Sequence, residues 1–574
     1  MILRAMLRAT AVALVLCGAK LTDPALAAGA GTLRGQIETY LKRLGALHWD
    51  GADTFDVRDD GDAAVAVLAN GRFSVRKNPA DPKPAATITI DRLEIRRKPA
   101  ASGGEVEFDV TLPSRTTLVA ADGTEFTLAL TDPAASAVVE EPDDRYRSLS
   151  ASFAGARIER TGSADWIKFG AMTTQSKVAA SDGGGWNGPI DFEVKAVEFL
   201  FTDAALGGTI DRIRYSADAS GPSLADLDAL RDEVGGLRQK AQDDPAAKPD
   251  LWLALLPKFF AVFTRSKGEL AVEGTSVKRP GGDTLVTLAK ATMAGSMTGL
   301  GSDGAAVRFT FGHDGLAIAP SLVPEPQVPR RMVVDFGIEQ IAGAPLRTIL
   351  DAASKTGPGA SDADKQAVLP QIIGAAMALK PLLRLYQLTL DFKEVRIDAG
   401  GEAKRAPPPP IGYAASGDIT VHGFDALPGI LTAKDERMYL PLVKFLGIPE
   451  DDADGAKAVK FHLTSETGKP LAVNGNDIGG WQAGGRSGPT PPGWQRLLRL
   501  ADPPEEGSDV RAVQNAVKAN EAEPFADGVY DTATALAVAR FQKQAGLNIS
   551  GVVDAATRDK LGLTPAQAQP RPKQ

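Results

Sequence analysis

Cysteine is almost absent from this sequence, since Cys17 is the only one in 574 residues. A single cysteine cannot form an intrachain disulfide, so a disulfide framework is excluded. Cys17 also lies in an N-terminal segment that we expect to be removed during export. The remaining chain would then have no thiol, which excludes a cysteine nucleophile and a cysteine-ligated metal site.

Histidine is also scarce. No two of the four histidines have the spacing of paired metal ligands; they are His48, His313, His422 and His462. The G-x-S-x-G motif of serine hydrolases is absent. We therefore predict no catalytic residue, no metal site and no cofactor.

The chain has no run of basic residues and no long apolar run. Its 64 Lys and Arg residues are outnumbered by 72 Asp and Glu residues, which gives a net charge of −8. This balance disfavours nucleic acid and anionic membrane surfaces as partners. No segment of the mature chain approaches the roughly 18 apolar residues that a membrane-spanning helix needs, so we expect no transmembrane segment. Aromatic residues make up only 6%, but the 43% hydrophobic content suffices for a sizeable core.

The N-terminus has the pattern of a secretory signal. Arg4 and Arg8 form a positive region, Ala9–Cys17 is a short apolar stretch, and Ala25–Ala27 fits the A-x-A cleavage pattern. We predict a signal peptide over residues 1–27 and a periplasmic location.

Cys17 offers an alternative, in which the chain is a lipoprotein. Leu16 precedes this cysteine, at a position where a lipid-attachment site usually has Gly or Ala. Cleavage near Ala27 is therefore favoured, and the mature chain would begin at Ala28 or Gly29.

Alternation of apolar and polar residues dominates the region 28–220. Between residues 105 and 112 the alternation predicts a strand with one wet face. The segments 87–96 and 189–201 alternate too, but the phase slips by one residue inside each. Such slips are typical of β-bulges, where a strand bends and swaps face. We predict an antiparallel, β-rich region.

The region 221–481 mixes helical and strand patterns and continues this body. Ser223 begins one helix, and residues 363–390 are helical in pattern, with Pro370 and Pro381 expected to interrupt them. A strand pattern with another slip follows at 388–397. Helices that lead into strands thus occur twice, so the body is either one domain or a duplicated pair.

Glycine and proline mark the end of the body. Residues 482–496 are rich in both and predict a linker between the body and a C-terminal domain over 497–563. Pro407–Pro410 predicts a stiff loop or connector, and 564–574 a disordered tail.

The domain after the linker has the most specific pattern of the chain. An apolar stripe with helical spacing, Val510 to Val517, precedes a Gly turn at 527–531 and a second helix that ends near Gly546. The turn and the helix start then recur 23 residues later, at 551–554. The aspartates of the two units, Asp531 and Asp554, stand at N-cap positions. We predict a three-helix bundle.

This stretch resembles the peptidoglycan-binding-like domain found at the ends of many cell-wall hydrolases. The resemblance rests on the motifs above together with Phe541-Gln542 and Gly551-Val552. It implies binding of the glycan or the stem peptide of peptidoglycan, without catalysis. The body only loosely resembles uncharacterised β-rich periplasmic proteins, which implies nothing about its ligand.

Five polar or flat side chains of the domain are the candidates for ligand contact: Asp527, Tyr530, Asp531, Thr534 and Gln542. Tyr530 could stack on a sugar ring or fill the edge of the bundle. For Gln542, a buried structural amide is an equally good interpretation.

Enzymes that carry this domain are usually amidases, transpeptidases or transglycosylases. These need a zinc-binding histidine cluster, a Cys–His pair, or a catalytic Glu in a helical lysozyme-like body, and the sequence offers none of these. We therefore predict that the chain is not an enzyme.

Together these patterns predict an α+β multidomain protein. A large antiparallel β-rich body with inserted helices would carry a small C-terminal three-helix module. The preferred function is a non-catalytic periplasmic envelope protein that binds peptidoglycan, with other envelope components as further partners. The alternatives are a periplasmic carrier of a lipid or other hydrophobic ligand, and a cell-wall hydrolase with an unrecognised active site.

Overall fold

The computed structural model describes most of the chain after residue 29. The described residues are 30–42, 47–76, 83–99, 104–140, 145–181, 184–243, 255, 258–259, 261–299, 304–354, 361–406, 412–431, 437–451, 457–478, 497–518 and 528–563. The predicted signal peptide (1–27), Pro407–Pro410 segment, linker (482–496) and tail (564–574) all lie outside them. The chain forms two compact units: unit 1 is Met1–Leu322 with Ile341–Leu379, and unit 2 is Val323–Gln340 with Lys380–Gln574.

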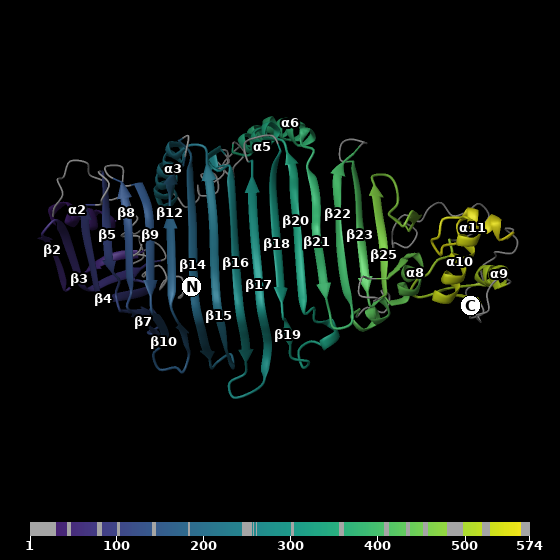
Figure 1. Ribbon diagram of the computed structural model, residues 1–574, viewed down its shortest axis with the longest axis horizontal. Helices are drawn as coiled ribbons and strands as arrows, with labels where there is room; N and C mark the ends of the chain where they lie inside the picture. Colours follow the sequence, from purple (N-terminus) through teal and green to yellow (C-terminus); the bar gives the residue numbers. More distant parts are fainter. Residues whose placement is uncertain are drawn as a thin grey trace. The chain divides into compact units, whose positions relative to one another are not determined.

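Unit 1 is built almost entirely from antiparallel strands (Figure 1). Its helices are α2 (Ala30–Lys42), α3 (Leu224–Asp243), α5 (Gly343–Ser354) and α6 (Asp362–Ala378). Its strands are β1 (Leu47–Gly51), β2 (Thr54–Asp60), β3 (Ala63–Val75), β4 (Ala86–Pro99), β5 (Glu105–Thr111), β6 (Arg115–Ala120), β7 (Glu125–Thr131), β8 (Ala134–Glu140), β9 (Arg145–Phe153), β10 (Gly155–Arg160), β11 (Trp166–Phe169), β12 (Met172–Lys177), β13 (Ala179–Ala180), β14 (Trp186–Phe201), β15 (Leu206–Gly221), β16 (Arg265–Lys278), β17 (Thr284–Thr298), β18 (Ala305–Asp314) and β19 (Ala317–Ile318).

Two long strands of unit 1, β4 and β14, each change partner along their length. The first half of β4 pairs with β6 and its second half with β5. Likewise, β14 pairs with β12 through residues 190–194 and with β11 through residues 198–200. The branches β5–β8–β9–β12 and β6–β7–β10–β11 join these two strands, so the pairings close into a ring.

The partner changes explain the phase slips in the sequence. In β4 the slip falls at residues 91–92, between the halves that pair with β6 and β5. In β14 it falls at Ala196, whose φ is +51°. Both strands bend there, as predicted, but Ile88 and Ile95 on either side of the β4 slip are buried in the same core. The prediction that the strand swaps face was therefore wrong, because the bend keeps both halves facing one interior.

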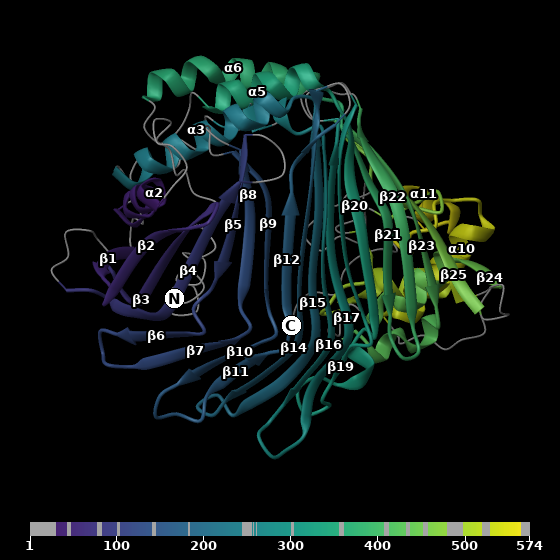
Figure 2. The same ribbon diagram turned by 60° about the vertical axis from the view of Figure 1, so that its left-hand side comes forward.

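The core of unit 1 fills the inside of this ring. The strand predicted over 105–112 is β5, and its inward side chains Val106, Phe108 and Val110 are buried while the alternate ones are not. Helix α2 adds Leu33 and Ile37 to the same core. Beyond the ring, β14 continues through β15, β16 and β17 to β18 as a sheet of long strands that curves in Figure 2.

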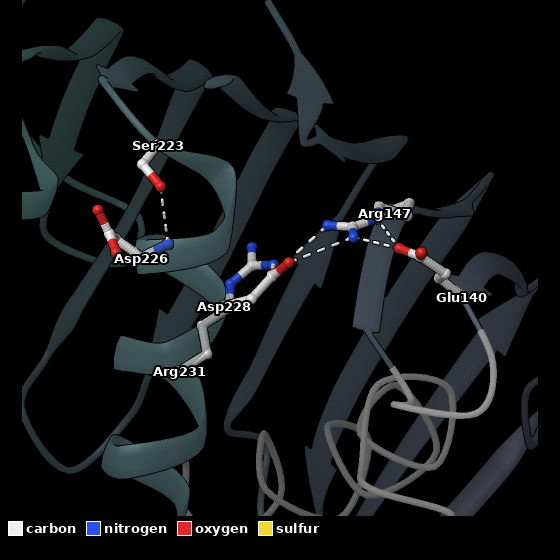
Figure 3. Close-up of polar contacts among 6 residues, drawn as sticks. All are labelled: Glu140, Arg147, Ser223, Asp226, Asp228 and Arg231. Atoms are coloured by element: carbon white, nitrogen blue, oxygen red, sulfur yellow. Dashed lines mark hydrogen bonds and ion pairs between the residues drawn. The ribbon is translucent and has the colours of Figure 1, made fainter. Parts of the chain in front are cut away.

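Helix α3 lies at one end of these long strands, as do α5 and α6 (Figure 2). Its apolar face, with Leu227 and Leu230, packs with Trp186 of β14. A buried ion pair joins the helix to β9: Asp228, only 2% exposed, accepts hydrogen bonds from Arg147, which also bonds Glu140 (Figure 3).

Unit 2 contains a second antiparallel sheet and the C-terminal module. The elements before the module are η3 (Glu325–Gln327), β20 (Arg331–Ile341), β21 (Leu382–Asp391), β22 (Arg396–Arg405), β23 (Tyr413–His422), η4 (Phe424–Gly429), α8 (Leu440–Leu446), β24 (Ile448–Asp451), β25 (Lys457–Glu466), β26 (Ala472–Val473) and β27 (Asn476–Asp477). The order of strand pairing is β20–β21–β22–β23–β25. One face of this sheet packs against η4 and α8 around Phe424, Leu446 and Phe461.

Three details of the predicted helix and strand pattern were wrong, and the first is that residues 382–390, predicted to be helical, belong to strand β21. Pro370 does not interrupt its helix, because α6 runs through it and ends at Ala378. The slip predicted within 388–397 is a hairpin turn between β21 and β22, not a bulge. The fold class itself, a β-rich antiparallel body with inserted helices and a helical C-terminal module, is confirmed. Among the helices that the structure describes, none combines the length and apolar character needed to span a bilayer.

Candidate functional site

The C-terminal module consists of three helices and a two-stranded pairing. The helices are α9 (Ser508–Lys518), α10 (Thr532–Gln544) and α11 (Ala555–Lys560), and β28 (Glu505–Glu506) pairs with β29 (Val529–Tyr530). Val510, Val513 and Val517, the predicted stripe of α9, are buried against Val538 of α10. The predicted three-helix core is therefore present in the described part of the module.

The helix starts of the module form as the sequence predicts. Asp531 and Asp554 are N-caps, and each carboxylate accepts a hydrogen bond from the backbone N–H three residues later, at 2.8 and 2.7 Å. The turn glycines Gly528 and Gly551 have φ of +82° and +65°. Side chains with a Cβ rarely adopt such values, so glycine is required at both turns.

Gln514 connects α9 to the first of these turns. Its side-chain carbonyl accepts a hydrogen bond from the Gly528 N–H at 2.8 Å, and its amide donates to the Val529 carbonyl at 3.0 Å. The amide also lies 3.2 Å from the hydroxyl of Thr534. Sequence reasoning assigned no role to Gln514, although it follows Val513 as Gln542 follows Phe541.

Gln542 serves the second turn in the same manner. Its carbonyl accepts hydrogen bonds from the N–H groups of Ser550 and Gly551, both at 2.9 Å. Its amide donates to the Val552 carbonyl at 2.8 Å and to the Thr557 hydroxyl at 2.9 Å. Each turn of the internal repeat is thus held by a buried glutamine and a threonine, which explains why the repeat keeps those residue types.

Tyr530 lies in the centre of the module. Its ring is fully buried, and its hydroxyl donates a hydrogen bond to the Gly551 carbonyl at 2.8 Å. Burial raises the pKa of this phenol well above its ordinary value, and the nearby carboxylates of Glu505 and Asp531 add to the effect. The side chain therefore joins the first turn to the second as a neutral hydrogen-bond donor.

The structure gives most of the predicted contact residues a structural role. Tyr530, Thr534 and Gln542 have no exposed surface, and their polar groups bond inside the module. A ligand cannot reach buried side chains, so the prediction of direct contact is corrected for these three. Asp531 is half-buried and remains a predicted contact residue, while Asp527 lies outside the described residues.

The module packs directly against helix α8 of unit 2. Met438 and Tyr439 join the apolar core of the module. The Tyr439 hydroxyl donates to the Leu500 carbonyl at 3.0 Å, and the Thr532 hydroxyl donates to the Met438 carbonyl at 3.2 Å. Leu442 is almost fully buried, and its methyl groups lie so close to Gly551 that a Cβ there would be 3.0 Å away.

A second contact joins the module to the end of the unit 2 sheet. The Asn548 side chain accepts from the Asp477 N–H at 2.5 Å and donates to the Asp477 carbonyl at 2.9 Å. The Ile549 N–H donates to the Asn476 side chain at 3.2 Å. The linker predicted before the module lies outside the described residues, and the described residues show the module packed against the rest of unit 2 at two places.

The exposed side chains of α9 and α11 offer the module a polar surface. They are Ser508, Arg511, Asn515, Lys518, Asp559 and Lys560. The cationic and amide groups among them donate hydrogen bonds and the Asp559 carboxylate accepts them, which suits the hydroxyl, amide and carboxylate groups of peptidoglycan. Elsewhere, no group of three or more histidine, cysteine or acidic side chains placed to hold a metal ion occurs within the described ranges.

Comparison with known proteins identifies the same region. The family model of the peptidoglycan binding domain matches residues 506–561, which span α9, α10 and α11. Neither a curated protein nor a solved structure gave a significant match to the chain. The C-terminal region is therefore a peptidoglycan-binding-like module, and this match supports peptidoglycan binding.

Replacing Leu442 with alanine is expected to loosen the module from α8. The loss should be about 2–3 kcal/mol, near the lower end for a buried leucine, because two packed elements can partly close the gap. The loosening should appear as faster hydrogen exchange in the α10 peptide 532–544. Leu446→Ala is the matched control, since Leu446 is buried one turn later in the sheet-side core. Equal effects of both variants on α10 would contradict a specific role of Leu442.

Proposed function

We propose that the chain is a non-catalytic protein of the bacterial cell envelope that is exported to the periplasm and attaches to peptidoglycan through its C-terminal module. The family match at residues 506–561 carries the proposal. The caps, glycine turns and glutamine contacts of that module support it, because they provide a folded scaffold for the exposed polar side chains.

Export and the lack of catalysis rest on the sequence. The N-terminal pattern of Arg4, Arg8 and Ala25–Ala27 supports a cleaved signal peptide. The scarcity of histidine, and the loss of Cys17 with the signal, supports a binding role over hydrolysis. The packing of the module against α8 and β27 supports a unit 2 sheet that is held close to the wall.

Co-sedimentation with purified, protein-free sacculi tests the attachment. We expect residues 28–574 to pellet with sacculi and to stay in solution without them. Deletion of the module is unsuitable, because it would expose Leu442 and Tyr439. Gln542→Leu, which removes hydrogen bonds from the module interior, should reduce the pelleted fraction by about tenfold or more, because an unfolded module no longer presents its polar surface.

Gln544→Leu is the matched control, because Gln544 is exposed on the same helix. It should pellet like the unchanged chain. Failure of the unchanged chain to pellet would overturn the proposal, and full pelleting of a Gln542→Leu chain with an unfolded module would place the attachment in the body. Release of soluble muropeptides from the sacculi would instead favour the hydrolase alternative.

A further inference from the structure

The sheet of long strands in unit 1 has one apolar face. Strand register places side chains from β14, β15, β16, β17 and β18 in rows across the sheet, and partners in a row share a face. Four successive rows on one face have no Asp, Glu, Lys or Arg. They are Gly188–Ala219–Ser266–Met297–Val307, Ile190–Ala217–Gly268–Gly295–Phe309, Phe192–Tyr215–Leu270–Met293–Phe311 and Val194–Ile213–Val272–Ala291–His313.

The opposite face of the same strands is polar. Its rows interleave with the apolar ones and include Pro189–Asp218–Lys267–Ser296–Arg308 and Lys195–Arg212–Glu273–Lys290–Asp314. Arg212 and Glu273 form an ion pair there at 2.5 Å. Strand alternation thus separates a hydrated face from an apolar one, as in a sheet with one buried side.

The apolar face continues the core of the closed ring. One row runs from Val110 through Ala135, Ala151 and Thr174 to Phe192, so the interior of the ring and the apolar face lie on the same side of the sheet. Burial then decreases along the row: Val110 is 2% exposed, whereas Met293 and Phe311 are 57% and 43% exposed. The ring closes over the first part of this face, and the later strands leave it open.

The open part of this face, made by the four rows, lies on a curved sheet, and we name it the apolar trough. The sheet curves toward the interior of the ring (Figure 2), which makes the apolar side concave. At one end, α3 packs with Trp186 and Ala219 on this side. In the row between Ile190 and Phe309 the side chains are small, with Ala217, Gly268 and Gly295. The aromatic side chains of Phe309 and Tyr215 lie beside the two glycines, each 3.6 Å from the place that a Cβ would take.

The chemistry of the trough favours hydrocarbon over protein. A protein interface needs about one hydrogen bond per 100–200 Å². Within the four rows the polar side-chain groups are Ser266, Tyr215 and His313. Burial lowers the pKa of His313, with Asp314 opposing the shift, which favours its neutral form. A second copy of the sheet would need a flat or convex apolar face, whereas a flexible hydrocarbon chain can follow a concave face of aliphatic and aromatic side chains.

A separate feature of α6 suggests where such a chain would come from. Leu369, Ile373 and Met377 stand four residues apart on this helix and are 52%, 50% and 42% exposed. Val368 and Ala375 are buried instead. From Gln366 to Leu379 the sequence has no charged residue. An exposed, uncharged apolar stripe of this kind suits contact with the surface of a bilayer, and α6 lies at the same end of the strands as α3 (Figure 2).

We propose that the apolar trough of β14–β18 binds the acyl chain of a membrane phospholipid, which enters from a bilayer that α6 contacts. The trough supplies the hydrocarbon environment, and α3 closes one end of it. This binding is independent of wall attachment by the C-terminal module, which lies in unit 2.

Uptake of phospholipid from vesicles tests the proposal. Residues 28–574 are incubated with dioleoylphosphatidylcholine vesicles, separated from them by flotation, and the bound lipid is measured by mass spectrometry. Met293→Glu with Phe311→Glu places two carboxylates on facing strands in the trough. Because charge is strongly disfavoured next to hydrocarbon, we expect about tenfold less bound lipid or lower.

The matched control is Thr292→Glu with Thr310→Glu, which adds the same charges to the polar face of the same strands. It should bind lipid like the unchanged chain, and circular dichroism checks that both variants fold. Ile373→Glu should slow uptake from vesicles without changing the final amount, whereas Gln371→Glu on the same helix should not.

Any of four results would overturn phospholipid binding in the trough. The unchanged chain takes up no phospholipid, the trough variant binds as much as the control, or free oleic acid binds while phospholipid does not. A dimer in sedimentation that the trough variant abolishes would assign the trough to a second copy and would also overturn it. An unchanged uptake rate in Ile373→Glu would overturn entry at α6.

Discussion

Replacing Gln542 with leucine is expected to unfold the C-terminal module while the rest of the protein stays folded. The change removes the acceptor of two backbone N–H groups and the donor to the Val552 carbonyl and the Thr557 hydroxyl. All these groups are buried, and each costs about 1–3 kcal/mol when it is left unsatisfied. We expect a loss of about 3–5 kcal/mol in the free energy of unfolding of the module.

Hydrogen exchange followed by mass spectrometry would measure this loss. Exchange in α10 and α11 should accelerate about a hundredfold or more, since each 1.4 kcal/mol is a factor of ten. Exchange in β16 and β17 of unit 1 should not change. Gln544→Leu, on the exposed side of α10, should leave all peptides as they were. A Gln542→Leu protein with wild-type exchange in α11 would show that these hydrogen bonds contribute little.

Replacing Asp228 with alanine is expected to release α3 from the sheet of unit 1. Asp228 is 2% exposed and faces Arg147 of β9 and Arg231 of its own helix (Figure 3). Without it, Arg147 would keep the more exposed Glu140 but lose its buried partner, and Arg231 would lose the carboxylate of its own helix. Removing one partner of a buried ion pair typically costs about 3–5 kcal/mol, because the remaining charge is left in a poorly solvated place.

Asp226→Ala provides the control for this prediction, since Asp226 is an exposed carboxylate in the first turn of the same helix. Asp226→Ala should lower the stability of α3 by less than about 1 kcal/mol, because it removes only a favourable interaction with the helix dipole. Exchange of the peptide 224–237 and the fluorescence of Trp186, which packs with α3, would report the release. If both variants behave alike, the ion pair does not hold the helix.

The prediction of the module succeeded because its determinants are local. An N-cap aspartate, a positive-φ glycine and a helical apolar stripe each act within a few residues, and all three were found at Asp531, Gly528 and Val510 to Val517. The candidate site was predicted less well. Polar type alone does not distinguish Gln542, buried in a hydrogen-bond network, from an exposed contact residue, because burial depends on neighbours far along the chain.

The strands of the body were predictable for a related reason. Alternation with period two reports which side of a strand is apolar, and β5 follows that pattern. The phase slips in β4 and β14 were visible in the sequence as well. The sequence could not show that each strand changes its pairing partner there and closes a ring, because that depends on which strands pair.

By itself, the sequence determined the local elements of this protein: the β-rich class, the helix caps and turns of the module, and the resemblance that points to peptidoglycan. Only the tertiary structure decided that the module packs against α8, that Tyr530 and Gln542 serve its interior, and that the apolar face of β14–β18 stays open. The physical reason is that caps, turns and periodicity depend on residues near in sequence, whereas burial depends on which distant strands pair and where that pairing ends.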